Sequence, residues 1–255
     1  MEQFNPFNLI GKTVLITGAS SGIGQQCAID CSRMGARVAL FGRNENRLNE
    51  TLSMMEGDGH NIYRVDLTDS EAVKQTVAKT VAQMGRLDGL VNCAGISGVF
   101  PLKLMSEERI LEFFRANVVS TVELTREVLK KKHFNPAGGS VIFFSSVMGV
   151  VGDKGKSLYG MTKGALIAGA RALACEFAER KVRVNAISPG AILTPININA
   201  PYMQDEQARS TLESKHLLGF GETTDISNGV IYLLSDASRW ITAQNIIIDG
   251  GYTAQ

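Results

Sequence analysis

Short apolar runs alternate along the chain with longer segments in which apolar positions recur at helical spacing. The runs are continuously apolar, which is typical of strands covered on both faces of a sheet. Strands are expected at residues 13–18, 37–42, 61–66, 87–95, 140–146, 182–188 and 245–250, of which 61–66 is the least apolar. Helices are expected between them, at residues 22–34, 44–55, 69–84, 106–132, 157–180 and 223–235. The repeated strand–helix–strand order predicts an α/β fold built on a parallel sheet with right-handed crossovers.

The segment 195–217 interrupts this alternation. It is polar, it contains Pro195 and Pro201, and it falls between the last two expected strands. A long excursion at such a place is typical of a lid over a site. The chain has no repeat, low-complexity tract or linker rich in proline and glycine, so we expect residues 1–255 to form a single domain.

Composition and charge narrow the possible partners. The formal net charge is +1, which gives no electrostatic reason to expect binding to nucleic acid or to a membrane surface. No apolar run reaches the length of a membrane span, and the first residues, MEQFNPFNLIGK, lack the features of a secretory signal. The cysteines, Cys27, Cys31, Cys93 and Cys175, are expected to be reduced core thiols without a metal, in a cytoplasmic protein.

The sequence TGASSGIG at 17–24 follows the first expected strand and begins the first expected helix. Gly18, Gly22 and Gly24 would let main-chain N–H groups and the positive end of a helix approach a phosphate closely. The spacing differs from that of a nucleoside-triphosphate P-loop, and no Lys-Ser/Thr pair follows. A tight turn alone would also require glycine, but the position after the first strand of an alternating chain favours binding of a dinucleotide.

The end of the second expected strand bears on which dinucleotide is bound. NAD-binding folds often place an acidic residue there for the ribose hydroxyls, whereas this chain has Gly42 followed by Arg43. A guanidinium pairs well with a 2′-phosphate, so NADP(H) is favoured and NAD(H) stays the alternative. The preference depends on Arg43 alone, because Ser21 adds no second positive charge, and Arg43 could equally be a solvated residue. Asp66, after the third expected strand, is placed to accept from the adenine amine or to begin a helix.

In SLYGMTKGAL, residues 157–166, Tyr159 and Lys163 stand one helical turn apart and would share a helix face. A free tyrosine has a pKa of about 10, too high for an efficient base at neutral pH. A lysine ammonium nearby favours the phenolate and lowers that pKa. The pair therefore predicts an acid–base site, although the same spacing also occurs incidentally on partly exposed helices.

Several motifs occur together: TGASSGIG, NCAG at 92–95, Asn117 in a long helix, serines at 145 and 146, and the Tyr159–Lys163 pair. In this order and spacing the chain resembles the short-chain dehydrogenase/reductase family from about Lys12 to Gly251. The resemblance implies a single doubly wound Rossmann-type domain with a seven-stranded parallel sheet. It also implies a catalytic set of Asn117, Ser146, Tyr159 and Lys163. Ser146 is preferred because its spacing from Tyr159 and the following VMG look like the family's pattern, and Ser145 is the alternative.

The same resemblance assigns roles to these residues. Tyr159 would exchange a proton with the substrate oxygen, Ser146 would hold that oxygen, Lys163 would bind the nicotinamide ribose, and Asn117 would bind a water that links Lys163 to solvent. Ile192 and Thr194 would reach the nicotinamide carboxamide. Contacts with the cofactor are expected at Gly18, Ser20, Ser21, Gly22, Ile23, Gly24, Arg43, Asp66, Leu67, Asn92, Ala94, Gly95, Tyr159, Lys163, Pro189, Gly190, Ile192 and Thr194. One departure from the family is Ala243, where a glycine is usual, and it is expected to be tolerated.

The substrate is less well defined by the sequence. The stretches expected to wall the pocket are mostly apolar and hold no arginine cluster that would require a carboxylate or phosphate. The leading hypothesis is an oxidoreductase that reduces a ketone or 3-oxoacyl thioester with NADPH, or oxidises a secondary alcohol in reverse. The alternatives are an NAD-dependent alcohol or sugar dehydrogenase and a non-catalytic dinucleotide-binding sensor. Candidate contacts for an acyl carrier protein, which could also be solvated helix ends, are Lys130, Lys131, Lys132 and Arg180.

Small residues are frequent in the expected helix 157–180 and permit close packing against a sheet or a second subunit. The family resemblance implies a homodimer or homotetramer built from this helix and 106–132.

Overall fold

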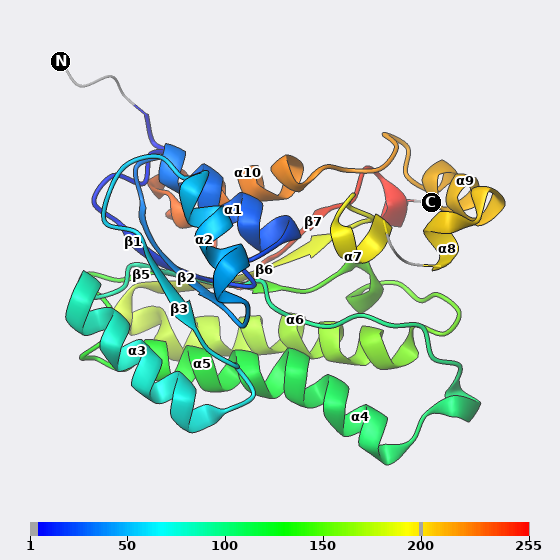
Figure 1. Cartoon of the computed structure of the whole chain (residues 1–255), viewed down its shortest axis with the longest axis horizontal. Helices are drawn as coiled ribbons and strands as arrows, with labels where there is room; N and C mark the ends of the chain where they lie inside the picture. The colour runs from blue at the N-terminus through cyan, green and yellow to red at the C-terminus, as the bar shows by residue number, and fades with distance from the viewer. Residues whose placement is uncertain (1–4, 199–200, 255) are drawn as a thin grey trace.

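The computed structural model describes residues 5–198 and 201–254. Its strands form one parallel sheet in the order β3-β2-β1-β4-β5-β6-β7, with helices on both faces (Figure 1). The predicted α/β doubly wound fold is therefore confirmed. The strands are β1 (Thr13–Thr17), β2 (Arg37–Gly42), β3 (Asn61–Arg64), β4 (Gly89–Asn92), β5 (Gly139–Phe144), β6 (Val182–Pro189) and β7 (Asn245–Ile248).

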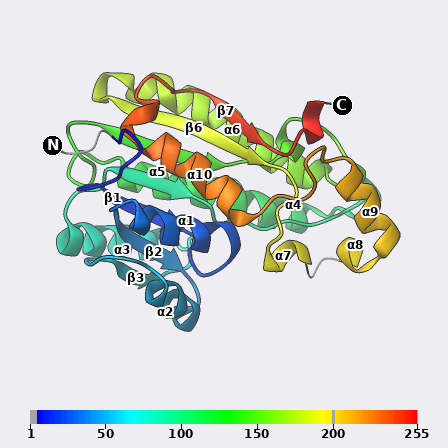
Figure 2. The same ribbon diagram turned by 90° about the horizontal axis from the view of Figure 1, so that it is seen from above.

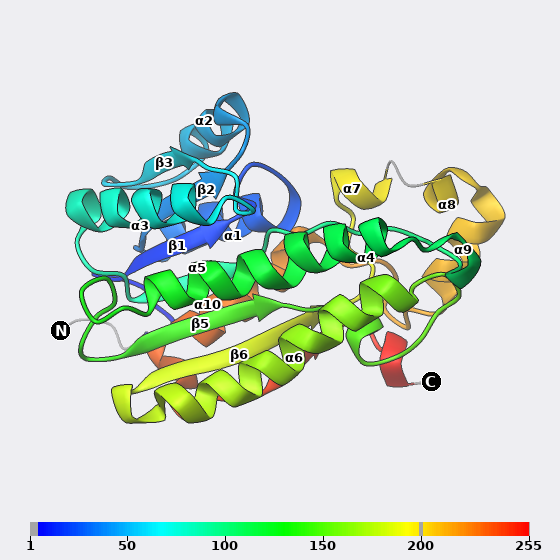
Figure 3. The same ribbon diagram turned by 90° about the horizontal axis from the view of Figure 1, so that it is seen from below.

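Two apolar layers enclose the sheet and explain its continuously apolar strands. On one face, seen in Figure 2, Val14 and Ile16 of β1 pack in a core with α1 (Gly22–Arg33) and α10 (Thr223–Leu234). On the other, seen in Figure 3, Leu15 packs in a core with α3 (Ser70–Met84), α5 (Ser120–Val128) and α6 (Ser157–Phe177). Successive residues of a strand point to opposite faces, so a sheet covered twice needs an apolar residue at every position.

The helix expected at 106–132 has a different internal structure. It consists of α4 (Glu107–Phe114), a π-helical turn at Arg115–Val119, and α5, which follow one another without a break. Figure 3 shows α4 and α5 running on as one long rod. Helix α2 (Glu45–Ser53) follows β2, and its Asn44 cap accepts a hydrogen bond from the N–H of Arg47.

The segment predicted as a lid contains α7 (Pro195–Ile198), α8 (Pro201–Gln204) and α9 (Glu206–Ser214), while 199–200 lie outside the described residues. These short helices lie toward one end of the molecule (Figure 1).

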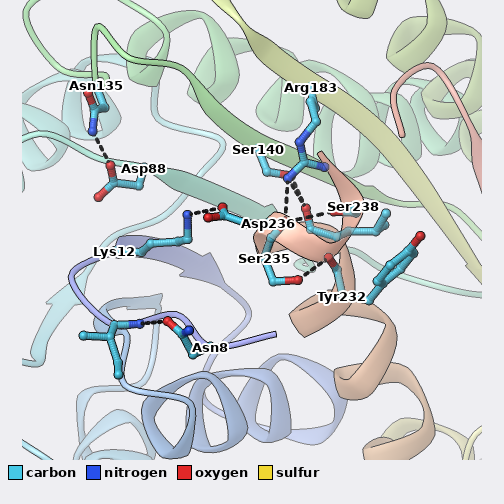
Figure 4. A network of polar contacts seen from close by, with 12 residues as sticks. Asn8, Lys12, Asp88, Asn135, Ser140, Arg183, Tyr232, Ser235, Asp236 and Ser238 are labelled. Atoms are coloured by element: carbon cyan, nitrogen blue, oxygen red, sulfur yellow. Dashed lines mark hydrogen bonds and ion pairs between the residues drawn. The ribbon is translucent and has the colours of Figure 1, made fainter. Parts of the chain in front are cut away.

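The opposite end of the sheet is closed by a polar network around the end of α10 (Figure 4). Arg183, at the start of β6, donates through Nη2 to the carbonyl oxygens of Leu233 at 2.7 Å and Ser235 at 3.3 Å. Ser140 on β5 donates to the same Leu233 oxygen at 2.7 Å. The last carbonyls of a helix have no partner within the helix and carry partial negative charge, so a cation there stabilises the helix end.

The cysteines and Ala243 differ in part from what the sequence led us to expect. Cys27 and Cys31 are buried as predicted, but Cys175 is exposed on α6 and is not a core thiol. Ala243 is accommodated in the fold, yet its backbone has a φ of +61°, in the left-handed region that favours glycine. The alanine at this position therefore strains the backbone locally.

Candidate active site

The glycine turn after β1 adopts a conformation that depends on its glycines. Gly18 and Gly22 have φ values of +66° and +57°. A Cβ on Gly24 would lie 2.4 Å from the carbonyl oxygen of Gly18, so no larger residue fits there. Ser21 is the N-cap of α1 but makes no capping hydrogen bond through its side chain, which leaves the first N–H groups of α1 facing outward. This arrangement suits an anionic group such as a phosphate.

A cleft of about 320 Å³ opens beside this turn, where the strand order reverses between β1 and β4. Ligands of open α/β sheets bind at this kind of switch point. The loops from β1 and β4 meet closely there, since the N–H of Ala94 donates to Thr17 Oγ1 at 3.0 Å and a Cβ on Gly18 would lie 3.2 Å from Ala94. The cleft brings together these predicted cofactor residues: Gly18, Ser20, Ser21, Gly22, Ile23, Gly24, Arg43, Asp66, Leu67, Ala94, Gly95 and Thr194.

Arg43 and Asp66 lie on the rim of the cleft at the ends of β2 and β3. Arg43 is exposed and, within the part of the chain that the structure describes, makes no hydrogen bond or ion pair. The Asp66 carboxylate accepts hydrogen bonds from the N–H and hydroxyl of Thr68, at 2.9 and 2.8 Å. These bonds, with a smaller contribution from the Arg43 charge, lower the pKa of Asp66. A cationic and an anionic side chain thus stand beside the same end of the cleft.

Tyr159 and Lys163 lie on one face of α6, as their spacing predicts. The Lys163 Nζ is 5.6 Å from the centre of the Tyr159 ring and donates a 2.8 Å hydrogen bond to the carbonyl oxygen of Phe144. It also lies 3.4 Å from the position that a Cβ on Gly95 would take. Gly95 lines the cleft, whereas the predicted catalytic residues Asn117, Ser146, Tyr159 and Lys163 lie behind it and are not among its lining residues. The pair therefore stands between the sheet end and the proposed cofactor site.

Burial controls the charge of this lysine. Only 5 % of Lys163 is exposed. Desolvation lowers the pKa of Lys163 to about 8, against a small opposing effect of Cys93. Desolvation also raises the pKa of Cys93, to about 12, so that this thiol stays neutral near pH 7. Lys163 is thus an amine that can gain or lose a proton close to neutral pH.

Asn117 is fully buried in the π-helical turn, where it joins two other segments. Its Oδ1 accepts from the N–H of Ile96 at 2.7 Å, and its Nδ2 donates to the Ile96 carbonyl and to Thr162 Oγ1, both at 3.0 Å. Both donors of the amide are used, so its side chain has only the second lone pair of Oδ1 left for a water. That oxygen lies 3.0 Å from the position of a Cβ on Gly95, on the same side as the Lys163 amine.

The two serines at the end of β5 have different surroundings. Ser145 Oγ donates to the carbonyl oxygen of Lys163 at 2.8 Å and so ties α6 to the sheet. Ser146 Oγ accepts a longer bond, 3.2 Å, from the N–H of Met148. The Ser146 hydroxyl keeps its proton for another acceptor in this arrangement. These contacts favour Ser146 over Ser145 as the residue that holds a substrate oxygen.

The turn after β6 reaches the cleft only at its far end. Thr194 packs against Gly22, whose Cβ would lie 3.4 Å from its side chain, whereas Pro189, Gly190 and Ile192 are not among the residues that line the cleft. Ile192 is buried in the core beneath α10. Contacts of Pro189, Gly190 and Ile192 with a cofactor therefore remain predictions.

The Asn92 side chain does not face the cleft. Its side chain points to the other face of the sheet, where Nδ2 donates to Thr125 Oγ1 of α5 at 3.2 Å. Asn92 is buried there and does not line the cleft, so its contribution is to hold β4 against α5.

The basic residues considered for a carrier protein are also far from the cleft. Lys130 pairs with Glu127, and Arg180 donates to the Leu129 carbonyl at 2.6 Å. Both residues follow the C-terminal ends of α5 and α6 and lie near the N-terminal ends of β5 and β6. The cleft lies at the opposite, C-terminal ends of the strands. They give no support to a docking site beside the candidate active site.

Sequence reasoning missed several residues that shape the site. Thr17 joins the two loops of the cleft, Thr162 orients Asn117, and Ile96 supplies both main-chain partners of Asn117. Thr162 could have been found, because it follows Tyr159 by three residues on the same helix. Ile96 could not, because its contribution is made by main-chain atoms. Within the described ranges, no helix is long and apolar enough to cross a membrane, and no group of three or more His, Cys, Asp or Glu side chains could hold a metal ion.

The fold is that of a doubly wound α/β protein, and the cleft at its switch point is of the kind that binds a dinucleotide. A family model described as enoyl-(acyl carrier protein) reductase matches residues 18–253. The chain is 36 % identical to glucose 1-dehydrogenase of Gluconobacter oxydans, over 95 % of this chain and 92 % of that protein. It is 35 % identical to 3-oxoacyl-(acyl-carrier-protein) reductase of Thermotoga maritima, over 95 % of this chain and 98 % of that protein.

Solved structures agree with these relatives. A putative short-chain alcohol dehydrogenase from Sinorhizobium meliloti superposes with a TM-score of 0.92 at 33 % identity, covering 98 % of this chain and all of that one. A putative NAD(P)-dependent gluconate 5-dehydrogenase from Beutenbergia cavernae, with bound NADP, gives a TM-score of 0.90 at 29 % identity, covering 98 % of this chain and 100 % of that one. The chain belongs to the short-chain dehydrogenase/reductase family, whose enzymes act on alcohol and ketone groups with NAD(P)(H).

Proposed function

We propose that this protein is an NADP(H)-dependent enzyme that interconverts a ketone, including a 3-oxoacyl thioester, and the corresponding secondary alcohol. The observation that carries the proposal is the position of Lys163, buried, under the Tyr159 ring and against Gly95 at the wall of the cleft. A site that only binds the phosphates of a dinucleotide does not need a tyrosine–lysine pair. A site that transfers a proton beside the bound dinucleotide needs such a pair.

The cofactor supplies the hydride, or accepts it in the oxidative direction. In reduction, the Tyr159 hydroxyl gives its proton to the oxygen of the substrate as that oxygen gains charge, while Ser146 donates a hydrogen bond to the same oxygen. The Lys163 ammonium favours the phenolate left on Tyr159. Proton transfer of this kind contributes about 10²–10⁴-fold to a rate.

Asn117 holds the path by which Lys163 regains a proton. A Cβ on Gly95 would lie 3.0 Å from Asn117 Oδ1 and 3.4 Å from Lys163 Nζ, so both groups face the same side of Gly95, and a water between them would bridge the two. Because both amide donors of Asn117 are engaged with Ile96 and Thr162, the water donates to Oδ1 and accepts from the lysine.

The preference for NADP(H) depends on Arg43. Its guanidinium stands free at the rim of the cleft in the described part of the chain, and Gly42 replaces the carboxylate that would repel a 2′-phosphate. The preference is tested by titrating wild-type protein and the Arg43→Ala variant with NADPH and with NADH. The control variant is Arg86→Ala, whose residue precedes β4 at the end of the sheet away from the cleft. We expect NADPH to bind more tightly, and Arg43→Ala to remove that difference while Arg86→Ala leaves it. An Arg43→Ala variant that kept the wild-type ratio would leave the NAD-dependent alternative.

The reaction is tested with a panel of ketones, 3-oxoacyl thioesters, sugars and their alcohols. Wild-type protein should turn over at least one of them, and Tyr159→Phe should lose about 10²-fold or more of kcat while still binding the dinucleotide. Tight binding of NADPH with no turnover by either protein would favour the non-catalytic sensor. Turnover of thioesters alone, or of sugars alone, would assign the substrate class.

We also propose that the protein forms a homodimer or homotetramer through α4–α5 and α6. Apolar side chains on these helices are exposed, and Leu111, Val119, Val122 and Met161 leave 61, 48, 43 and 50 % of their surface uncovered. Such a surface is typical of an interface between subunits. Light scattering on Val122→Lys and wild type tests this, and a wild-type monomer would exclude it.

A further inference from the structure

His216 follows α9 and connects parts of the chain that are distant in sequence. Its Nδ1 lies 2.9 Å from the carbonyl oxygen of Leu212 in α9. Its Nε2 lies 3.0 Å from the main-chain nitrogen of Ala191, in the turn after β6. The side chain is almost fully buried, with 4 % of the residue exposed.

These two bonds define the form of the imidazole. A carbonyl oxygen can only accept, so Nδ1 carries the proton that it donates to Leu212. Nε2 then has a free lone pair and accepts from the N–H of Ala191. The neutral ring thus acts as donor on one side and acceptor on the other, and both ring nitrogens are used.

The ring is also held by the end of the chain. Its centre lies 4.8 Å from that of Tyr252 and 5.9 Å from that of Phe220. A Cβ on Gly190 would lie 3.0 Å from His216 Nε2 and 2.8 Å from the Cα of Asp249, so only glycine fits between them. His216 is therefore fixed against the turn by packing as well as by hydrogen bonds.

The bond to Ala191 is the one that a side-chain substitution can change. The N–H of Gly190 donates to Ile248, the N–H of Gly221 donates to the carbonyl of Ala191, and the N–H of Leu193 donates to Gly221, all between main-chain atoms. His216 binds the 190–193 turn through its side chain, by the hydrogen bond from the N–H of Ala191. The same turn leads directly to Thr194, which packs on Gly22 at the phosphate end of the cleft.

We propose that His216 is a positioning residue that fixes the 190–194 turn for the dinucleotide and couples it to α9 and to the C-terminal segment. The inference rests on the proposed function and on the expectation that Ile192 and Thr194 contact the cofactor. Loss of the acceptor at Nε2 leaves the partly buried Ala191 N–H without this partner, and the turn loosens.

Two substitutions separate positioning from packing. His216→Gln keeps an acceptor that reaches the Nε2 position, whereas His216→Asn keeps a donor near the Nδ1 position but has no acceptor within reach of Ala191. Both lose the ring that packs at a tilt against Tyr252, so their melting temperatures should fall by similar amounts. We expect the Kd for NADPH to rise about tenfold in the Asn variant and by no more than about threefold in the Gln variant. The kcat at saturating cofactor should change less than the KM for NADPH.

Hydrogen exchange of the ligand-free protein provides a readout that does not depend on activity. The Ala191 amide should exchange faster in His216→Asn than in His216→Gln or wild type. Equal exchange and equal Kd values in the two variants would overturn the inference, and so would faster exchange with an unchanged Kd. Wild-type protein that bound neither NADPH nor NADH would instead overturn the proposed function, while the exchange result would still report whether His216 holds the turn.

Discussion

The ammonium of Lys163 lies against the ring of Tyr159, 5.6 Å from its centre, and is anchored to the sheet through the Phe144 carbonyl. The helix spacing alone would allow the lysine to extend into solvent. Its anchor keeps it under the phenol, where its charge acts on the proton that the phenol gives or takes. The protonation of one residue is therefore linked to the chemistry of the other.

The first prediction concerns pH. Because burial lowers the pKa of Lys163 to about 8, its proton is lost as the pH rises through that value. The kcat/KM for carbonyl reduction, which reports on the free enzyme, should decline above pH 8. In Lys163→Arg the guanidinium stays protonated, so any remaining activity should show no decline near pH 8. A decline at the same pH in both proteins would mean that another group is responsible.

The space in front of Gly95 should be needed for the proton path. Gly95 has no positive φ, so an alanine strains no backbone, but its Cβ would lie 3.0 Å from Asn117 Oδ1 and 3.4 Å from Lys163 Nζ. We expect Gly95→Ala to lower kcat by about 10²-fold, within the range of proton-transfer effects. Gly152→Ala is the control, since nothing lies within 4 Å of its added Cβ. Full activity in Gly95→Ala would show that no water is required there.

The two serines should give opposite results. Ser146→Ala should lower kcat by about 10²-fold, the effect of removing a donor to a developing oxyanion, with little change in melting temperature. Ser145→Ala loses the bond to the Lys163 carbonyl and should destabilise the fold by about 1 kcal/mol while retaining most activity. Stopped-flow kinetics and thermal unfolding of both variants measure this. The reverse result would make Ser145 the catalytic serine.

Arg183 should stabilise the fold without affecting the reaction. Arg183→Met removes the charged donor from the carbonyls of Leu233 and Ser235, which should lower the free energy of unfolding by about 2 kcal/mol. Arg239→Ala, an exposed residue near the same end, should change it by less than about 0.5 kcal/mol. Denaturant unfolding measures both. The kcat/KM of folded Arg183→Met should equal that of wild type, because the residue lies at the sheet edge opposite the cleft.

Ala243 offers the opposite change in stability. Its φ of +61° brings the Cβ close to a carbonyl oxygen, a strain of about 1–2 kcal/mol that glycine does not have. Ala243→Gly should therefore raise the free energy of unfolding, by about 1 kcal/mol after the greater flexibility of unfolded glycine is subtracted. A lower melting temperature in this variant would show that the lost methyl contacts outweigh the strain.

Much of the fold could be predicted from pattern alone. Continuous apolar runs occur where a strand has two covered faces, and each of the expected strands is found. The strand expected at 87–95 is longer than the observed strand β4. Leu87 forms only an isolated bridge to Phe134, and the chain leaves the sheet after Asn92. The glycine turn could also be predicted from the sequence, because the positive φ of Gly18 and Gly22 and the lack of space at Gly24 require glycine.

The remaining features depend on contacts between distant segments. The Asn92 side chain lies on the face of the sheet that α5 covers, where it binds Thr125, and this contact joins residues 33 positions apart. The role of His216 depends on Ala191 and Tyr252, and no local pattern announces either contact. The π-helical turn likewise forms around bonds from Asn117 to the main chain of Ile96, which a helical periodicity does not reveal.

The π-helical turn at Arg115–Val119 has a consequence for any change in the number of residues before α5. A turn of this kind holds one residue more than an α-helix would, and each residue of an α-helix rotates the following side chains by about 100°. Deleting a single residue there would regularise the rod and leave Leu124 and Val128 facing the sheet, but it would remove the widened turn from which Asn117 binds the main chain of Ile96. A shortened chain should therefore keep the packing of α5 on the sheet while losing the arrangement of Asn117 at the candidate active site.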